Sequence, residues 1–306
     1  MRVAAIDVGT NSTRLLVAEQ QAQGFRSIDR RLVVTRLGEG VDRRRRLAPE
    51  ALQRTLAVIA DYAASCGEYG VTQLRVTGTS AVRDAHNRSE FFEGVSKLTG
   101  AEPELLTGDQ EARATFLGAL SDLTDDVVSL VVDIGGGSTE LVVGREEPHR
   151  LVSLDAGCVR MLEKHLQSDP PSPDELASLR EEVVVILEEA RRSLAVPSGA
   201  RMIGVAGTVT QLAALRSGAA VYDPNLTHHS TLSHGDVRRL ARRLASLTFE
   251  QRTRIKGLEP GRADVIVAGA EILLAVMEVF DSAEVLVSEK DILDGLVIQM
   301  LDGTPD

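Results

Sequence analysis

Residues Ala5–Val17 read AIDVGTNSTRLLV, and residues Val131–Val143 read VVDIGGGSTELVV. The two stretches share aspartate, glycine, serine and threonine at a constant offset of 126 residues, which carries Asp7 onto Asp133. Each is an apolar run, a tight glycine turn and a second apolar run, which is the pattern of a β-hairpin with a polar tip. A repeat at this distance predicts two similar domains and not a short-period solenoid.

We expect the first domain to cover residues 1–123 and the second to cover residues 124–306. Short β-branched runs alternate with longer helical patterns along the chain, which predicts an α/β fold with mostly internal sheets. The expected strands include residues 3–6, 14–19, 73–77, 127–133, 140–143 and 202–205. The expected helices include residues 109–120, 158–165, 174–194, 235–245 and 262–280.

Composition narrows the class of protein. The chain has 306 residues, of which 43% are hydrophobic and 26% charged, so most of it is expected to fold. Two cysteines are too few for a disulfide framework. The apolar stretch 265–280 contains Glu271 and Glu278, which favours a buried helix over a membrane span. The first strand has no basic leader, so we expect a cytoplasmic protein with reduced thiols.

The charge of the chain is unevenly distributed. The net charge of −11 argues against a general nucleic-acid binder. Residues 26–46 nevertheless hold eight arginines against three acids, and residues 236–254 hold six against two. Guanidinium groups match phosphate oxygens in shape and charge, so either segment is a candidate track for a polyanion. An ordinary solvated surface is the simpler explanation of both segments.

The two hairpin tips have the chemistry of a phosphate site. Several glycines allow backbone N–H groups to converge on an anion, and serine and threonine hydroxyls add further donors. The strand-end acids Asp7 and Asp133 would repel phosphate, so we expect a divalent cation, Mg²⁺ or Mn²⁺, beside them. Either hairpin alone is most simply an ordinary turn, but the duplication favours a phosphate clamp.

Three further segments are weaker candidates by themselves. Gly207 and Thr208 lie between an expected strand and helix, where free N–H groups attract anions. Arg83 follows another strand in the segment TGTSAVR. Glu111 lies in the first turn of a helix that Thr107 and Gln110 are expected to open as a capping box. Acids are common at helix starts, so Glu111 has an ordinary explanation too.

These motifs together resemble the exopolyphosphatase / guanosine pentaphosphate phosphohydrolase (Ppx/GppA) family. The resemblance covers nearly the whole chain and includes IDVGTNSTRLLV, TGTSAVRDAHN, TGDQEARATFLG, VVDIGGGSTEL, GVAGTVTQLA, PGRADVIVAGAEIL and SEKDILDGLV. It implies two similar actin-like, Hsp70-like or sugar-kinase-like (ribonuclease H-like) domains facing a central cleft. The chain looks like the short, two-domain form. The resemblance implies metal-dependent removal of the terminal phosphoryl group of inorganic polyphosphate.

The resemblance also implies roles for residues. Glu111 looks like the base for the attacking water, and Asp133 and Glu140 look like catalytic ligands of metal and water. Asp7 is the corresponding acid of the first loop and is expected to contact the metal. The expected phosphate-binding residues are Asn11, Ser12, Arg83, Gly135, Gly136, Gly137, Ser138, Gly207 and Thr208. Similar enzymes are often homodimers.

Other activities remain open at this point. One is hydrolysis of guanosine pentaphosphate, another is a kinase of the same superfamily, and a third is a non-catalytic sensor of polyphosphate or guanosine tetraphosphate. No nucleic-acid or membrane partner is expected. The chain has Ile292-Leu293-Asp294-Gly295 where many relatives carry Gly-Leu-Arg-Glu-Gly, which puts a phosphate role there in doubt. The cluster His228, His229 and His234 is expected to be loop histidines and not a metal site.

Overall fold

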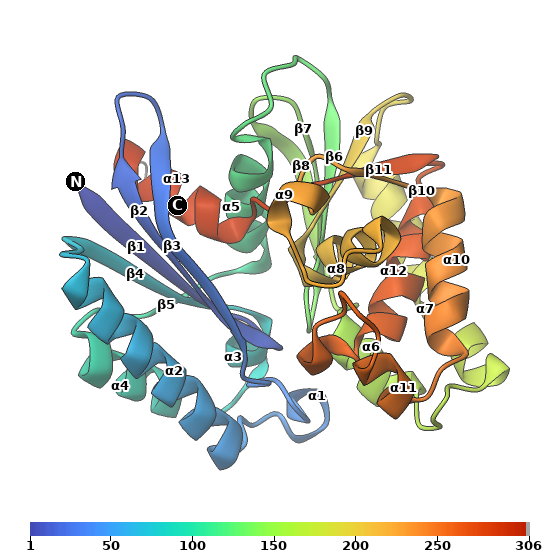
Figure 1. Ribbon diagram of the computed structural model, residues 1–306, viewed down its shortest axis with the longest axis horizontal. Helices are drawn as coiled ribbons and strands as arrows, with labels where there is room; N and C mark the ends of the chain where they lie inside the picture. The colour runs from blue at the N-terminus through green and yellow to red at the C-terminus, as the bar shows by residue number, and fades with distance from the viewer. Residues whose placement is uncertain (304–306) are drawn as a thin grey trace. The chain divides into compact units, whose positions relative to one another are not determined.

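The computed structural model describes residues 1–303, and the chain forms two compact units (Figure 1). The first unit combines Met1–Ser121 with the segment from Lys290 onward, and the second is Asp122–Glu289. Each unit is a mixed β-sheet with helices, which confirms the predicted two-domain α/β fold. The first crossing between the units lies close to the expected boundary after residue 123. The segment from Lys290 onward differs from the expectation, because it belongs to the first unit.

The first unit is built on a five-stranded sheet in the order β3-β2-β1-β4-β5. Its strands are β1 (Arg2–Val8), β2 (Ser12–Gln20), β3 (Phe25–Val34), β4 (Gln73–Gly78) and β5 (Glu104–Leu105). Its helices are α1 (Val41–Arg44), α2 (Pro49–Glu68), α3 (Ser80–Asp84), α4 (Arg88–Thr99), α5 (Gly108–Leu120) and α13 (Ile292–Asp302).

Strand β1 is buried on both faces, and its alternating side chains enter two different cores. Ala4 and Ile6 pack with residues of α2 and α4. Val3 and Ala5 pack with residues of α5 and α13 on the other face. This alternation is what a central strand covered by helices on both sides requires, and the helices lie on opposite sides of the first sheet in Figure 1.

Close packing of backbone holds α13 in the first unit. A Cβ atom on Gly118 of α5 would overlap the Asp291 carbonyl, and one on Gly295 of α13 would overlap the Ala114 carbonyl. The two helices therefore meet without intervening side chains. Asp294 of α13 is buried and forms an ion pair with Arg30 of β3 at 2.5 Å. Burial raises the pKa of Asp294, and the Arg30 guanidinium opposes this rise.

These contacts explain why the last segment returns to the first unit. They are made between residues far apart in the sequence, so the local pattern gave no sign of them. They also give Asp294 a structural role as the partner of Arg30. The final residues 304–306 of the expected second domain lie outside the described residues.

The second unit is built on a six-stranded sheet in the order β10-β11-β9-β6-β7-β8. Its strands are β6 (Ser129–Ile134), β7 (Thr139–Gly144), β8 (Pro148–Leu154), β9 (Arg201–Val205), β10 (Thr231–Ser233) and β11 (Glu284–Val287). Its helices are α6 (Cys158–His165), α7 (Pro173–Leu194), α8 (Ala206–Ser217), α9 (Pro224–Thr227), α10 (His234–Ala245), α11 (Phe249–Thr253), the 3₁₀ turn η1 (Pro260–Arg262) and α12 (Ile266–Val279).

The most apolar helix of the second unit is α12, which the sequence predicted as a buried helix. Almost all of its residues are buried in the core of this unit, including Glu271. Burial raises the pKa of Glu271, and Arg180 of α7 opposes the rise. Among residues 1–303, no helix combines the length and the apolar character that a membrane crossing needs. Cys66 and Cys158 are buried thiols, as expected, and burial raises the pKa of each to about 11.

We predict that Gly295→Ala destabilises the protein by about 1–3 kcal/mol, because the added methyl group must push α13 away from α5. Gly67→Ala in α2 is the matched control, since a Cβ there meets nothing within 4 Å. That variant is expected to be neutral or slightly stabilising. Urea denaturation of both variants checks the prediction. Equal unfolding midpoints for the two would contradict the close helix crossing.

Candidate functional site

Each unit carries a β-hairpin whose turn is closed in the same way. The Gly9 N–H donates to the Ser12 carbonyl at 3.0 Å, and the Gly135 N–H donates to the Ser138 carbonyl at 3.0 Å. The strands around the hairpins also correspond, because the orders β3-β2-β1-β4 and β8-β7-β6-β9 have the same directions. The repeat in the sequence is therefore a repeat in the structure.

The two hairpins differ at the residue opposite the strand-end aspartate. Asp7 is in register with Arg14, whereas Asp133 is in register with Glu140. Residues directly opposite each other on antiparallel strands place their side chains on the same face. The first hairpin therefore pairs an acid with a cation, and the second places two acids side by side.

Asp7 is almost fully buried, and both of its carboxylate oxygens are engaged. Oδ2 accepts hydrogen bonds from Arg14 Nε at 3.2 Å and Nη2 at 2.6 Å, and Oδ1 accepts one from Thr77 Oγ1 at 3.2 Å. The Arg14 guanidinium already forms an ion pair with this carboxylate. A metal at Asp7 would have to displace this ion pair, so the expected metal role of Asp7 is disfavoured by its surroundings.

Asp133 and Glu140 offer a better cation site. Their exposed fractions are 6% and 1%, and Ser153 Oγ donates to Glu140 Oε1 at 2.7 Å. Two carboxylates buried on one face repel each other and favour a bound cation or a shared proton. An all-oxygen pair of acids is the donor set that a hard divalent cation such as Mg²⁺ prefers. These residues fit the cation that the sequence predicts.

The second hairpin tip is held so that its N–H groups face one way. The carbonyls of Gly135 and Gly136 accept from the N–H groups of Cys158 and Val159, at the start of α6. The Gly137 carbonyl accepts from Arg160 Nε at 2.8 Å. In a planar trans peptide the N–H points opposite to the carbonyl. The next N–H groups, those of residues 136–138, therefore face away from α6 and form a nest of donors for an anion.

The first hairpin tip contains two buried polar atoms without partners. Thr10 Oγ1 and Asn11 Nδ2 have no hydrogen-bond partner among residues 1–303, and both residues are less than 10% exposed. A buried donor left unpaired costs about 1–3 kcal/mol. Ser12, the next residue, is partly exposed. These neutral donors are suited to a phosphoryl oxygen.

Glu111 and Arg83 are brought together in the first unit. Arg83 Nη1 lies 3.4 Å from Glu111 Oε2 and donates to the Leu106 carbonyl at 2.9 Å. The predicted capping box of Thr107 and Gln110 is confirmed, and it places Glu111 in the first turn of α5. The Glu111 side chain is 12% exposed. The positive end of the helix and the Arg83 guanidinium both favour a carboxylate here.

Gly207 and Thr208 form the first turn of α8, as the strand–glycine–helix pattern predicted. The preceding Ala206 has φ 64°, and α8 has no side-chain cap, so its first N–H groups are available to an anion. The sequence did not single out Arg262. Its buried guanidinium lies over Gly207, where a Cβ would collide with it, and its Nε donates to Glu259 Oε2 at 3.1 Å. The signal in the sequence that could have identified it is the motif PGRAD, which contains this arginine.

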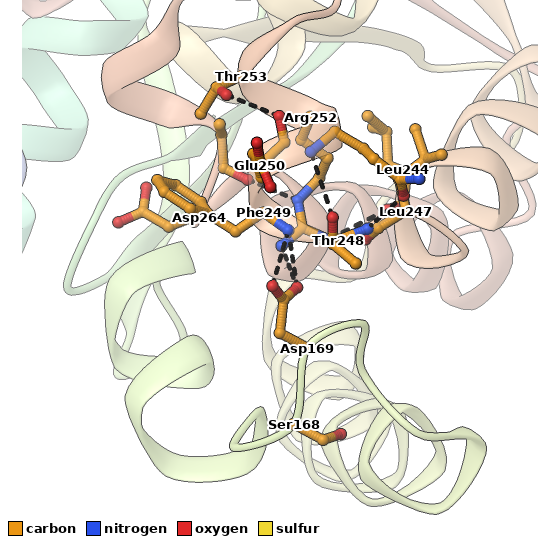
Figure 2. A network of polar contacts seen from close by, with 12 residues as sticks. Ser168, Asp169, Leu244, Leu247, Thr248, Phe249, Glu250, Arg252, Thr253 and Asp264 are labelled. Carbon is orange, nitrogen blue, oxygen red and sulfur yellow. Dashed lines mark hydrogen bonds and ion pairs between the residues drawn. The ribbon is translucent and has the colours of Figure 1, made fainter.

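A second buried arginine anchors the segment that carries Arg262. Arg252 donates to the carbonyls of Leu247 at 2.6 Å, Ala263 at 2.7 Å and Leu244 at 3.2 Å. Figure 2 shows this network, in which Asp169 also accepts from the Phe249 N–H at 2.7 Å. Because Ala263 follows Arg262 directly, these bonds fix the backbone from which Arg262 extends.

His228 and His229 lie beside Asp122, and their ring centroids are 3.9 Å apart. His228 Nε2 is 2.8 Å from Asp122 Oδ2, and its Nδ1 accepts from the Glu289 N–H at 3.1 Å. Nδ1 is therefore unprotonated and Nε2 carries the hydrogen. A neutral histidine that binds metal through Nε2 needs a hydrogen on Nδ1. The group is better explained as a hydrogen-bonded cluster, and His234 lies apart from it, against Glu278.

Comparison with known proteins gives a consistent result. A sequence profile of the Ppx/GppA phosphatase family matches residues 16–304. Exopolyphosphatase 2 of Mycobacterium tuberculosis is 39% identical over 98% of both chains. A crystal structure of an exopolyphosphatase-like protein superposes with a TM-score of 0.94 at 36% identity, covering 98% of this chain and 97% of the other.

A crystal structure of an exopolyphosphatase from Cytophaga hutchinsonii superposes with a TM-score of 0.91 at 26% identity, covering 100% and 99% of the two chains. The duplicated hairpin and the order of the strands define a two-domain α/β protein of the actin-like, Hsp70-like and sugar-kinase-like type. Within that type, the chain belongs to the Ppx/GppA phosphatase family.

We predict that neutral His228 carries its hydrogen on Nε2, with Nδ1 as the acceptor for the Glu289 amide. Long-range ¹H–¹⁵N correlation spectra at pH 8 would report this tautomer directly. Zinc added to the protein is expected to leave the His228 and His229 signals in place. The hydrogen-bonded assignment would be contradicted if zinc changed the chemical shifts of both rings and no longer changed those of His228 in the His229→Gly variant. Glycine suits this control because His229 has φ 58°.

Proposed function

We propose that this protein is an exopolyphosphatase, which hydrolyses the terminal phosphoanhydride bond of inorganic polyphosphate and releases orthophosphate. The family and the names of its relatives support this activity. The structural observation that carries the proposal is the acid pair Asp133 and Glu140 at the hairpin whose tip offers a nest of N–H groups. Phosphoryl transfer needs this combination, because catalysis depends mainly on positioning and charge stabilisation.

In the second unit, Asp133 and Glu140 would hold Mg²⁺ or Mn²⁺, which when bound neutralises charge on the phosphoryl oxygens. The N–H groups of residues 136–138 donate to oxygens of the terminal phosphoryl group. Gly207 and Thr208 offer the free N–H groups of α8 to a neighbouring phosphate. We add Arg262 to this set, since a buried guanidinium over Gly207 can donate to the same phosphate.

In the first unit, Glu111 accepts a proton from the attacking water. The water oxygen forms a bond to the terminal phosphorus, and the bond from that phosphorus to the bridging oxygen breaks. The shortened chain leaves with the bridging oxygen. Arg83 holds the Glu111 carboxylate in place, and Asn11 and Ser12 donate to phosphoryl oxygens. Homodimerisation, a cytoplasmic location and binding of guanosine penta- or tetraphosphate stay predictions of the sequence.

We predict that Glu111→Gln lowers the rate of phosphate release by about 10²–10⁴-fold, the usual contribution of a general base. Binding of polyphosphate should be largely kept, because the amide has nearly the same shape. Asp109→Asn, in the same turn but exposed, is the control and should retain activity. Phosphate release is measured with Mg²⁺ from tripolyphosphate, long polyphosphate and guanosine pentaphosphate.

The outcomes of this experiment separate the alternatives. Normal turnover in Glu111→Gln would remove Glu111 from the mechanism. Release from the nucleotide alone would identify a guanosine pentaphosphate phosphohydrolase. Binding of polyphosphate without release by the unaltered protein would identify a sensor.

We further predict that Mg²⁺ raises the melting temperature of the unaltered protein, because a ligand that binds only the folded state stabilises it. Asp133→Asn and Glu140→Gln should lose this rise. Asp7→Asn should keep it, although its own metal-free melting temperature falls with the loss of the Arg14 ion pair. Differential scanning calorimetry with and without EDTA tests this. Loss of the Mg²⁺ response in Asp7→Asn alone would move the metal site to the first hairpin.

A further inference from the structure

The first arginine-rich segment, residues 26–46, divides into two parts in the structure. In the first segment, the arginines of strand β3 are already neutralised by carboxylates of their own unit. Each lies within 2.7 Å of a carboxylate oxygen, in the pairs Arg26–Glu19, Arg30–Asp294 and Arg31–Asp29. These residues therefore offer little charge to a polyanion. The run Arg43–Arg46 at the end of that segment is different.

The arginine quartet Arg43–Arg46 is exposed and only loosely paired. Arg45 and Arg46 lie 3.8 Å and 3.6 Å from Asp84 and Glu90, with more than half of each arginine side chain exposed. Exposed pairs of this kind contribute about 0–1 kcal/mol each. Arg43 forms no ion pair within residues 1–303. A phosphate chain could replace these partners at little cost.

The quartet is joined to the first hairpin tip by a short stretch of backbone. The Arg36 N–H donates to the Asn11 carbonyl at 2.9 Å, and the Gly38 N–H donates to the Thr10 carbonyl at 2.8 Å. A Cβ on Gly38 would collide with the Thr10 side chain, so the Gly38 backbone packs directly against Thr10. Helix α1 starts only three residues after Gly38, and it contains the first two arginines of the quartet.

Helix α3 completes the same surface. It contacts α1, and the His86 N–H just after it donates to the Arg45 carbonyl at 2.9 Å. Figure 1 shows α1 and α3 at the same end of the first sheet as the β1–β2 turn. Residues 36–46 contain five arginines and two acids, a local net charge of +3 in a chain whose net charge is −11. The first tip and the quartet therefore lie at the same end of the first sheet.

We propose that Arg43–Arg46 form a subsite for the part of a polyphosphate chain beyond its reacting end. Guanidinium groups bind successive phosphate oxygens as forks, and the subsite makes long chains bind more tightly than short ones. The inference rests on the proposed function for its substrate. It adds a basis for chain-length preference that the hairpin tips alone do not supply.

The test compares two arginine quartets. In the first variant Arg43–Arg46 become serine, and in the matched control Arg238, Arg239, Arg242 and Arg243 of α10 become serine. Each removes four positive charges from exposed residues. KM is measured with Mg²⁺ for tripolyphosphate and for polyphosphate of about 100 phosphates. Arg43→Ser/Arg44→Ser, which breaks no ion pair within residues 1–303, guards against misfolding of the full variant.

We expect the Arg43–Arg46 variant to raise KM for the long chain by about tenfold, a loss consistent with several weak exposed contacts. KM for tripolyphosphate should rise less than twofold. The double variant should shift the long-chain KM in the same direction by a smaller factor, and the α10 control should shift neither KM. Added salt should weaken the chain-length preference of the unaltered protein.

The subsite would be overturned if the two quartet variants raised the long-chain KM by the same factor. It would also be overturned if the Arg43–Arg46 variant raised KM equally for tripolyphosphate and for the long chain. Binding of long polyphosphate to the Glu111→Gln protein, measured by calorimetry, keeps the test independent of turnover. If the unaltered protein hydrolyses no substrate while the Arg43–Arg46 variant still loses binding, the proposed function fails and the subsite stands. Displacement by single-stranded DNA at equal phosphate concentration would overturn it in favour of general polyanion binding.

Discussion

The first unit depends on the two ion pairs formed by the Arg14 guanidinium. This guanidinium binds the buried Asp7 carboxylate from the adjacent strand and also forms an ion pair with Asp291, at the start of α13. Asp291 in turn caps α13 by accepting from the Leu293 N–H at 3.0 Å. One side chain therefore compensates the strand-end acid and ties the C-terminal helix to the central hairpin. Removing one member of a buried network of this kind leaves its partners unpaired, which costs more than a surface pair.

The two crossings between the units are also tied together by side chains. The chain leaves the first unit after Ser121 and returns at Lys290. In the first unit, Lys290 Nζ donates to Ser121 Oγ at 3.2 Å. In the second unit, His228 contacts both Asp122 and the Glu289 amide, and Tyr222 donates to the Glu289 carboxylate at 2.5 Å. Burial and the nearby Glu289 charge raise the pKa of Tyr222, so the phenol remains a donor.

Local signals predicted the hairpins and the Glu111 helix because their causes are local. A glycine turn between apolar runs and a capping box need only neighbouring residues. Strand β3 was missed because it is largely exposed and rich in charge, which hides the alternation of a strand. Helix α13 and its return to the first unit depend on Gly118 and Gly295, which lie far apart in the sequence.

The candidate site shows the same division between local and distant causes. The motif fixed the positions of Asp133, Glu140 and the glycine tip, since all lie within one hairpin. The pairing of Asp7 with Arg14 was also within one hairpin, yet the resemblance of the two tips favoured treating the acids alike. Arg262 was not singled out because its approach to Gly207 depends on how η1 packs, and Arg252 holds that packing through backbone carbonyls from two other segments.

The cross-strand difference gives the two hairpins different chemical capacities. The second hairpin places two buried carboxylates on one face, and a cation bound between them would reduce their mutual repulsion. At the first hairpin the acid already forms an ion pair with Arg14. The polar atoms of this tip that lack a partner among residues 1–303 are the neutral donors of Thr10 and Asn11. Two metal sites would follow from the repeat if both copies had kept an acid opposite the aspartate. Arg14 instead favours a single cation site, at the second hairpin, and the first tip offers neutral hydrogen-bond donors where the second offers carboxylates.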